Sequence, residues 1–427
     1  MGEKLKAVIL GMGSRGKNAY GAEFLTLKDR VEVVAIAEPD EERRRIGGDA
    51  HGVPADKRFS SAEELLACPK MADFACVCTQ DRQHAGHAVA AMKRGYDILL
   101  EKPVSPILSE LQNIVRVANE EGRRVVVCHV LRYTPFFGTI KKEIDSGRLG
   151  RIVNIQAIEN VRYFHQAHSY VRENWRREEE TSPMILAKCC HDLDYLIWLC
   201  GSRCERVSSF GSLFYFRPEN APEGAAMRCL DGCLAKETCP YDAEKIYLTN
   251  KDTGVLQGNT GWPADVLCEN PTEEKIREAL KKGPYGRCVF HCDNDVVDNQ
   301  IVNLQMENGA ALTLTMSAFT SGGGRTIKVM GTLGDLWGDM DQNILRITEY
   351  GKEPRVIDLA GQAEDSDGHG GGDRGLVLAF LDYMQGLKKD GTISTLETSI
   401  ESHLAALAAE TSRLRNGEPV EIAPMRS

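Results

Sequence analysis

Apolar residues in the first third of the chain fall into short runs that amphipathic stretches separate. The runs predict strands at residues 6–10, 31–37, 74–79, 97–101 and 125–129, and the stretches between them predict helices at residues 41–47, 60–67, 84–94 and 105–121. Strands that alternate with helices are typical of an α/β fold with a doubly wound parallel sheet. In such sheets ligands bind beyond the carboxyl ends of the strands, so the residues after each strand are the candidates for chemistry.

The pattern changes after residue 130, where apolar runs follow one another with few helices between them. Strands are predicted at residues 152–158, 207–216, 298–306, 310–317, 326–331, 334–339 and 344–349. This run of strands favours an α+β domain with a large, mostly antiparallel open sheet. The predicted helices at residues 185–199, 375–386 and 398–416 are expected to cover one face of it.

The length of the chain bears on its division into domains. A single hydrophobic core stops growing well below 427 residues, so two domains are expected, at residues 1–128 and 129–427. Residues 221–284 have little periodicity and contain several cysteines, and we interpret them as an irregular insertion in the second domain.

The first strand runs directly into the sequence Gly11-Met12-Gly13-Ser14-Arg15-Gly16. A strand, a glycine turn and a helix N-terminus together make an anion site, because free amides and the helix dipole stabilise a pyrophosphate. Gly11 permits the tight turn, Gly13 permits close approach of the phosphates, and Gly16 permits the helix to pack on the strand. We predict a dinucleotide site formed by these residues with Ser14 and Arg15, although a glycine turn without a ligand would have the same sequence.

The second strand ends at Glu38, where a dinucleotide would place its adenosine ribose. A carboxylate there accepts hydrogen bonds from the ribose hydroxyls and repels the additional phosphate of NADP. The sequence therefore predicts NAD as the preferred cofactor, and the alternative is a helix-capping or solvated acid.

Three further motifs lie at the strand ends or on a predicted helix: Thr79-x4-His84, Glu101-Lys102-Pro103 and His191-x2-Asp194. With the glycine motif and Glu38, they resemble the glucose–fructose oxidoreductase and inositol dehydrogenase (Gfo/Idh/MocA) family over nearly the whole chain. The resemblance implies an oxidoreductase. The predicted cofactor-binding residues then also include Thr79, Gln80, His84, Glu101 and Lys102.

The resemblance also implies that Lys102 is a catalytic or substrate-orienting residue. An ammonium near a hydroxyl that is being oxidised stabilises the developing alkoxide. His191 lies on a predicted helix and is expected to act as general base, since the histidine pKa lies near working pH. Asp194 lies on the same face, three residues on, and is expected either to hold the imidazole tautomer or to satisfy nearby backbone.

One position departs from the family pattern. Inositol dehydrogenase-like members carry an aspartate four residues before this histidine, where this chain has Ala187. Lys188 follows, and we expect it either to supply a charge on the substrate side or to signal chemistry other than simple alcohol oxidation.

A polar and aromatic segment at residues 165–176 suits a carbohydrate, which requires hydrogen-bond partners and an apolar surface beneath its ring. The alternative is a polar loop that packs an interface. The predicted substrate-binding residues are Lys102, Tyr133, His168, Tyr170, Arg172, Lys188, His191 and Asp194. Arg132 and His369 are weaker candidates for the same pocket.

The formal net charge of −10 argues against nucleic acids and anionic membranes as partners. No apolar run reaches the roughly 18 residues of a membrane span. We expect a cytoplasmic protein that binds a small carbohydrate. An exposed face of the second sheet favours oligomerisation through that sheet, and the family resemblance implies a homodimer or homotetramer.

Fourteen cysteines in such a chain indicate thiols or metal ligands rather than a disulfide framework. Cys229, Cys233 and Cys239 lie close together in the irregular insertion and could bind a structural zinc ion. The sequence leaves the fourth ligand open, and the candidates are Cys268, Cys288, His291 and Cys292. Free thiols are the alternative.

These observations favour an NAD-dependent oxidoreductase that acts on a sugar, glycoside or cyclic polyol. One alternative is a redox glycosidase, in which tightly held NAD oxidises carbon 3, elimination of the aglycone and addition of water follow, and the sugar is then reduced again. The other is a non-catalytic NAD sensor, since a fold can persist after catalysis is lost.

Overall fold

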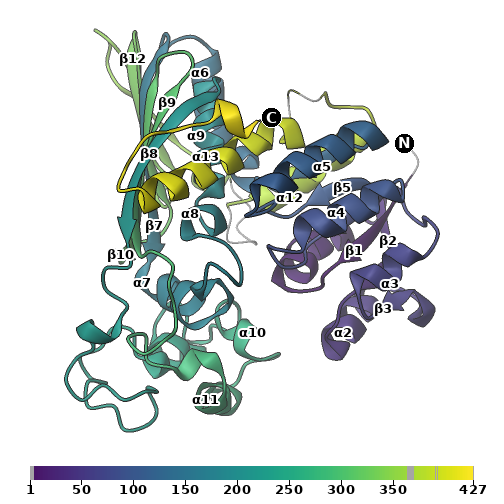
Figure 1. Ribbon diagram of the computed structural model, residues 1–427, viewed down its shortest axis with the longest axis vertical. Coiled ribbons are helices and arrows are strands. Elements are labelled where there is room, and N and C mark those ends of the chain that lie inside the picture. The colour runs from purple at the N-terminus through teal and green to yellow at the C-terminus, as the bar shows by residue number, and fades with distance from the viewer. Residues whose placement is uncertain (1–3, 363–369, 390, 392, 427) are drawn as a thin grey trace.

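The computed structural model describes residues 4–362, 370–389, 391 and 393–426. Its first sheet has six parallel strands in the order β3-β2-β1-β4-β5-β6 (Figure 1). The strands are β1 (Leu5–Leu10), β2 (Val31–Ala37), β3 (Arg58–Phe59), β4 (Phe74–Val77), β5 (Asp97–Leu100) and β6 (Val125–Val127). The strand order reverses direction from β1, which is the topology of a dinucleotide-binding fold and confirms the predicted class.

Helices separate these strands: α1 (Ala22–Thr26), α2 (Glu41–His51), α3 (Ala62–Ala67), α4 (His84–Lys93) and α5 (Leu108–Glu121). Strands β4, β5 and β6 are buried throughout, as expected for a parallel sheet covered on both faces. Side chains cap two of the helices, since Asp40 accepts from the Arg43 amide and Ser61 from the Glu64 amide.

The second sheet has nine strands in the order β14-β13-β12-β11-β7-β10-β9-β8-β15. They are β7 (Ile152–Arg162), β8 (Cys204–Ser212), β9 (Asn299–Met306), β10 (Ala311–Thr320), β11 (Arg325–Gly331), β12 (Gly334–Asp339), β13 (Ile344–Glu349), β14 (Arg355–Asp358) and β15 (Val420–Glu421). The pairs are antiparallel except for β10 with β7, which confirms a mostly antiparallel sheet.

One predicted strand ends earlier than its apolar pattern suggests. Strand β8 stops at Ser212, whereas the pattern continued to residue 216. The carboxylate of Asp298 accepts hydrogen bonds from the amides of Phe214 (2.9 Å) and Tyr215 (2.7 Å). A side chain has therefore replaced the neighbouring strand as the partner of this backbone, which turns away from the sheet.

Helices α9 (Cys190–Cys200) and α13 (Leu396–Leu414) pack on one face of the second sheet, and α6 (Pro135–Asp145) lies beside α9 (Figure 1). The single helix predicted at residues 185–199 is two helices, because α8 (Met184–Ala187) ends before α9 begins. Lys188 and Cys189 lie at the break between them.

The irregular insertion lies at one end of the second sheet, around α7 (Tyr163–His165), α10 (Ala264–Leu267) and α11 (Glu273–Lys282) (Figure 1). It has a small apolar core of its own, to which Phe216, Tyr247, Leu280 and Phe290 contribute. Most of its backbone belongs to turns, so few regular hydrogen-bonded elements hold it together.

Helix α12 (Gly372–Met384) follows the second sheet in sequence but packs against the first. Its Phe380 ring lies 4.8 Å from the Phe74 ring of β4, centroid to centroid. Leu376, Val377 and Leu381 bury against the same core. The first sheet is therefore completed by residues from near the C-terminus. In the described part of the chain no helix is long and apolar enough to span a membrane.

Candidate active site

The glycine turn after β1 leaves no room for side chains at two of its three glycines. Gly11 has a φ of +92°, and a Cβ there would lie 2.5 Å from the carbonyl oxygen of Cys78. A Cβ on Gly16 would lie 1.9 Å from the carbonyl oxygen of Gly11. A Cβ on Gly13 would meet no atom within 4 Å, so this position borders open space. This geometry fits a turn that presents its backbone to a pyrophosphate.

Glu38 lies beside this turn and is almost completely buried. Its carboxylate accepts hydrogen bonds from the Met12 amide (2.7 Å) and the Asp40 amide (3.0 Å). Each carboxylate oxygen has a second lone-pair site, so both can still accept a hydroxyl. The end of β2 is thus tied to the glycine turn through the Glu38 carboxylate.

Arg15 reaches across the turn to carboxylates from two distant parts of the chain. Its guanidinium donates to Glu101 at 2.6 Å, to the Tyr20 hydroxyl at 2.6 Å and to both oxygens of Asp373 in α12. Although burial raises the pKa of Glu101, the positive charges of Arg15 and Lys102 outweigh burial and lower that pKa. Glu101 is therefore an ionised partner of Arg15, and Asp373 is a member of this site that no local sequence pattern indicates.

The segment from Thr79 to His84 connects the end of β4 with the Glu101-Lys102-Pro103 turn. The two ring nitrogens of His84 lie 2.7 Å from the Pro103 carbonyl oxygen and 2.9 Å from the Thr79 carbonyl oxygen. Gln80 begins the intervening turn, with its amide 3.3 Å from the Gln83 side chain. His84 therefore holds the turn that carries Lys102.

Lys102 extends from the first sheet to the helices of the second. Its Nζ donates to the carbonyl oxygen of Ala187 at 3.2 Å, at the end of α8. Its amide donates to the Glu101 carboxylate at 2.6 Å. His191 lies in the first turn of α9, just beyond this contact, and is 6% exposed. The structure thus brings Lys102 and the helix of His191 to the same boundary between the two sheets.

Two further histidines lie beside His191. The ring of His129 is 5.8 Å from that of His191 and 5.6 Å from that of His403, centroid to centroid. Nε2 of His403 accepts a hydrogen bond from the Val104 amide at 2.9 Å, directly after the Lys102 turn. Burial is the largest cause that lowers the pKa of both, and the pKa of His403 falls to about 4.

The strand-end pattern pointed to the segment that begins at His129, after β6, but gave His129 itself no role. His403 was not predicted, because it lies within α13 and has no such signal. With burial and Lys102 nearby, both are neutral at neutral pH.

Asp194 is paired with the segment that follows β6. Its carboxylate accepts two hydrogen bonds from Arg132, both 2.6 Å, and lies 3.5 Å from Nε2 of His129. Tyr133 points elsewhere, because its hydroxyl lies 2.8 Å from both the amide and the hydroxyl of Ser394. Asp194 therefore fixes the strand end to α9, and Tyr133 fixes it to the segment before α13.

Lys188 belongs to a buried group of four charges. Its Nζ lies 3.2 Å from Glu159 of β7, which also binds Arg325 at 2.9 Å. Arg325 in turn donates to Asp192 at 2.8 Å. Burial raises the pKa of Asp192 to about 6, against the opposing effect of Arg325. Two acids and two bases balance, so the group adds rigidity beside α9 without net charge.

Models of a known oxidoreductase family match the chain in both halves. A domain described as "Oxidoreductase family, NAD-binding Rossmann fold" matches residues 5–129. A domain described as "Oxidoreductase family, C-terminal alpha/beta domain" matches residues 141–422. The chain belongs to the Gfo/Idh/MocA family. It is thus an NAD-binding oxidoreductase of this family, as the motifs in its sequence predicted.

Curated relatives are distant. The putative oxidoreductase YteT of Bacillus subtilis is 23% identical over 324 residues, which cover 73% of this chain and 72% of that protein. An inositol 2-dehydrogenase of Corynebacterium glutamicum is 26% identical over 206 residues, which cover 46% of this chain and 56% of that protein. The chain therefore matches little more than half the length of this dehydrogenase.

Solved structures of the Gfo/Idh/MocA type share the fold over the whole chain. An oxidoreductase from Agrobacterium radiobacter, in complex with NAD+, L-tartaric acid and magnesium, has a TM-score of 0.69 at 15% identity and covers 99% of this chain and 100% of that one. An inositol dehydrogenase homolog from Azotobacter vinelandii, complexed with NADH and myo-inositol, has a TM-score of 0.68 at 17% identity and covers 99% and 98%.

Three predicted substrate-binding residues of this Gfo/Idh/MocA protein lie in or beside its insertion. Arg172 is fully buried and donates to the carbonyl oxygens of Arg287 (2.8 Å) and Tyr241 (2.7 Å). His168 is also buried and stacks on Tyr285, with Nδ1 2.8 Å from the Tyr247 hydroxyl. These contacts hold the insertion to α7 and the segment after it.

Tyr170 is 5% exposed, and its ring centroid lies 5.9 Å from that of His165. Burial is the largest cause that raises its pKa well above the ordinary value. His369 lies outside the described residues. Within the polar segment, Tyr170 is thus the residue that most resembles a substrate-binding residue, because it carries a neutral hydroxyl on an aromatic ring.

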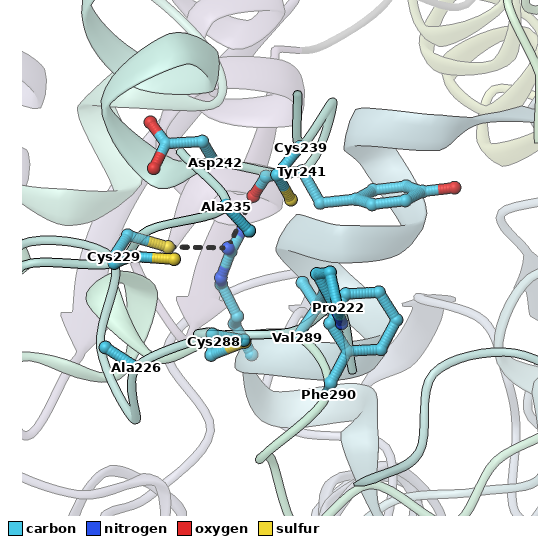
Figure 2. Close-up of a pocket in the computed structure, with 13 residues that line it drawn as sticks. Pro222, Ala226, Cys229, Ala235, Cys239, Tyr241, Asp242, Cys288, Val289 and Phe290 are labelled. Atoms are coloured by element: carbon cyan, nitrogen blue, oxygen red, sulfur yellow. Dashed lines mark hydrogen bonds between the residues drawn. The ribbon is translucent and has the colours of Figure 1, made fainter. Parts of the chain in front are cut away.

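Three cysteines of the insertion line one small cavity, which Figure 2 shows. Cys229, Cys233 and Cys239 line it together with Cys288. Within the described ranges, no group of three or more histidine, cysteine, aspartate or glutamate side chains has the arrangement of a metal site. The positions of these side chains therefore do not establish the predicted zinc site.

Proposed function

We propose that this protein transfers hydride between a ring carbon of a sugar, glycoside or cyclic polyol and the nicotinamide of NAD, with Lys102 and His191 handling the hydroxyl proton. The contact of Lys102 Nζ with the Ala187 carbonyl oxygen, 3.2 Å long, carries this proposal. It supports a site at which the end of the NAD-binding sheet meets the helix of His191.

The cofactor would be held by the glycine turn, with Ser14 and Arg15, and by Glu38. NAD, when bound there, accepts the hydride. The clash that a Cβ would cause at Gly11 and Gly16 supports a turn reserved for close backbone approach. The buried carboxylate of Glu38 supports a preference for NAD over NADP, because it would repel a second phosphate. Thr79, Gln80, His84 and Glu101 would line the nicotinamide side.

Lys102 and His191 would share the proton chemistry. The Lys102 ammonium would stabilise negative charge on the hydroxyl oxygen as hydride departs, and His191 would take the hydroxyl proton. Because His129 and His403 are neutral, they add no further positive charge beside Lys102.

The substrate class rests on relatives and on the polar groups beside Lys102. The relatives include an inositol 2-dehydrogenase and a homolog solved with myo-inositol. Lys188, although paired with Glu159, and Tyr170 would offer an ammonium and a hydroxyl on the side of the second sheet, and Asp194 holds Arg132 in place. Groups of this kind suit a ligand with several hydroxyls.

Redox-neutral glycoside cleavage is a second candidate because Ala187 stands where related dehydrogenases carry an aspartate. Without that carboxylate, Lys102 meets a backbone carbonyl at this position. The replacement of the aspartate by Ala187 favours a reaction in which another group handles the substrate proton. The two functions differ in whether NADH accumulates.

We also propose a cytoplasmic homo-oligomer. All fourteen cysteines are free thiols, which suits a reducing compartment. The face of the second sheet opposite α9 and α13 carries exposed Ile158, Phe210 and Ile301. These three lie in one row, since Ile301 pairs with Phe210 and with Thr315, which pairs with Ile158. Such a face favours self-association.

The test combines NAD with a panel of polyols, sugars and aryl glycosides. Net formation of NADH supports a dehydrogenase, and release of the aglycone without net NADH supports redox glycoside cleavage. If neither product forms, both proposed functions are contradicted. Lys102→Met should lower kcat by about 10²–10⁴-fold while NAD affinity changes little. Lys93→Met, at an exposed lysine on α4, is the matched control. A Lys102→Met enzyme with the parental kcat would refute the role of Lys102.

A further inference from the structure

Four cysteines, three in the insertion and one just after it, line one small cavity. Cys229, Cys233, Cys239 and Cys288 line it, and its volume is about 10 Å³. Figure 2 shows that Cys229 and Cys239 approach it from separate stretches of chain and that Cys288 closes another side. A cavity of this size has room for about one water molecule or one ion.

The backbone keeps two of these cysteines side by side although 59 positions of sequence separate them. Arg228 and Arg287 form an antiparallel bridge. The Cys229 amide donates to Gly286 (2.9 Å), and the Cys288 amide donates to Met227 (2.9 Å). The bridge therefore brings Cys229 next to Cys288, which the spacing of the cysteines in the sequence could not single out as the fourth ligand.

Of the candidates for a fourth ligand, Cys288 lines the cavity, whereas Cys268, His291 and Cys292 are not among its lining residues. The Cys292 thiol donates to the Cys288 carbonyl oxygen at 3.2 Å. Cys268 lies beside Glu269, whose carboxylate pairs with Lys17 of the first domain. Asp242 lines the cavity, but its Oδ1 accepts from the Lys245 amide at 3.0 Å, which closes a turn. These contacts favour Cys288.

Arg172 supplies an independent sign that the cavity holds negative charge. Its side chain is fully buried and lines the cavity. Nη2 donates toward the Cys229 sulfur at 3.7 Å, and the guanidinium also donates to two carbonyl oxygens. Nη1 has no hydrogen-bond partner within the described part of the chain. Negative charge nearby would stabilise a buried cation with an unused donor.

We propose that the insertion binds one zinc ion through Cys229, Cys233, Cys239 and Cys288, with Arg172 as the charge-balancing neighbour of the thiolates. Zinc with four thiolates carries a net charge of −2, which the guanidinium partly offsets. Because three or more ligands do not converge in the described residues, binding requires the thiols to turn inward. Each cysteine moves its sulfur by a single side-chain torsion between staggered positions.

The size of the cavity and the nature of the insertion favour a single structural ion. The cavity admits about one water-sized sphere, which matches the room that a single metal ion needs. The insertion has a small apolar core and few regular elements. Its free energy of folding therefore depends on additional links, which a tetrathiolate zinc provides.

The decisive experiment measures metal in the full-length protein, purified without chelators, by elemental analysis, together with acid-labile sulfide. We expect one zinc per chain and no sulfide. Cys233→Ser and Cys288→Ser should each lose most of the zinc. Cys268→Ser and Asp242→Asn should keep it, as controls for loss of a thiol and for loss of a carboxylate.

Replacement of the metal by Co²⁺ tests the site without a variant that risks misfolding. Four thiolates give visible ligand-field bands and intense thiolate-to-cobalt charge transfer. Absence of metal in the parent protein, iron with sulfide, or a zinc content in Cys288→Ser equal to that of the parent would each overturn the proposal. Far-ultraviolet circular dichroism, which reports the secondary structure of the whole chain, and NAD binding, which reports the first domain, show whether a variant that lost zinc is still folded.

Discussion

His403 offers a quantitative test of how the Lys102 turn is held. Its Nε2 accepts a hydrogen bond from the Val104 amide at 2.9 Å, and its Nδ1 lies 3.0 Å from the Ser399 carbonyl oxygen. The neutral ring with its hydrogen on Nδ1 satisfies both contacts. Protonation would place a second hydrogen on Nε2, facing the Val104 N–H. Burial, the largest cause, accordingly lowers the pKa of His403 from 6.5 to about 4.

The magnitude follows from proton linkage. Between pH 6.5 and 4 the unfolded chain binds a proton at this residue and the folded protein does not, so stability rises with pH in this window. The stability that the neutral ring contributes is fully present above pH 6.5 and is lost as the pH falls. At about 1.4 kcal/mol per pH unit, the full loss is about 3 kcal/mol.

The perturbation is His403→Gln, because the glutamine carbonyl can accept from Val104 and does not titrate. Urea unfolding at a series of pH values from 7.5 to 4.5 should give a shallower fall in the free energy of unfolding for the variant, by up to about 1.4 kcal/mol per unit. Above pH 7 the two curves should run parallel, which is the internal control. If parent and variant lose equal stability between pH 6.5 and 4.5, His403 is not a buried neutral base.

Three other predictions concern the cofactor turn and the open sheet face. Glu38→Ser should weaken NAD binding by about 10–100-fold and strengthen NADP binding, measured by calorimetry, and unchanged selectivity would argue against a ribose contact. Gly16→Ala should lower the free energy of unfolding by about 1–3 kcal/mol, whereas Gly13→Ala, with open space at its Cβ, should change it by less than about 0.5 kcal/mol in thermal denaturation. Ile301→Asp should dissociate the oligomer in light scattering, and Leu387→Asp, an exposed position off the sheet, should not.

Much of the fold follows from periodicity because local patterns decide most of its elements. Buried runs give β1, β2 and β4 to within a residue or two, and amphipathic stretches give α4 and α5. The pattern fails where a distant side chain intervenes. Asp298 ends β8 by taking its backbone amides, and no feature of residues 213–216 announces this.

The candidate site likewise contains residues that the sequence predicts and residues that it does not predict. The glycine turn, Glu38 and Lys102 are predictable because each lies immediately after a strand and depends on neighbouring residues. His403 and Asp373 reach the site from α13 and α12, 299 and 358 residues away from their partners Val104 and Arg15. Sequence spacing contains no information on such pairs. Likewise, only the bridge between residues 228 and 287 brings Cys288 beside Cys229.

The position of α12 has a consequence for how the protein is made. The first sheet is nearly complete once β6 has left the ribosome, but Phe74 and its neighbours lack their cover until Phe380 has been synthesised. At roughly 5–20 residues per second, this interval lasts on the order of tens of seconds. During this interval the nascent chain exposes an apolar face to which chaperones can bind and through which the chain can aggregate. Residues 1–128 expressed alone should behave as that nascent chain does.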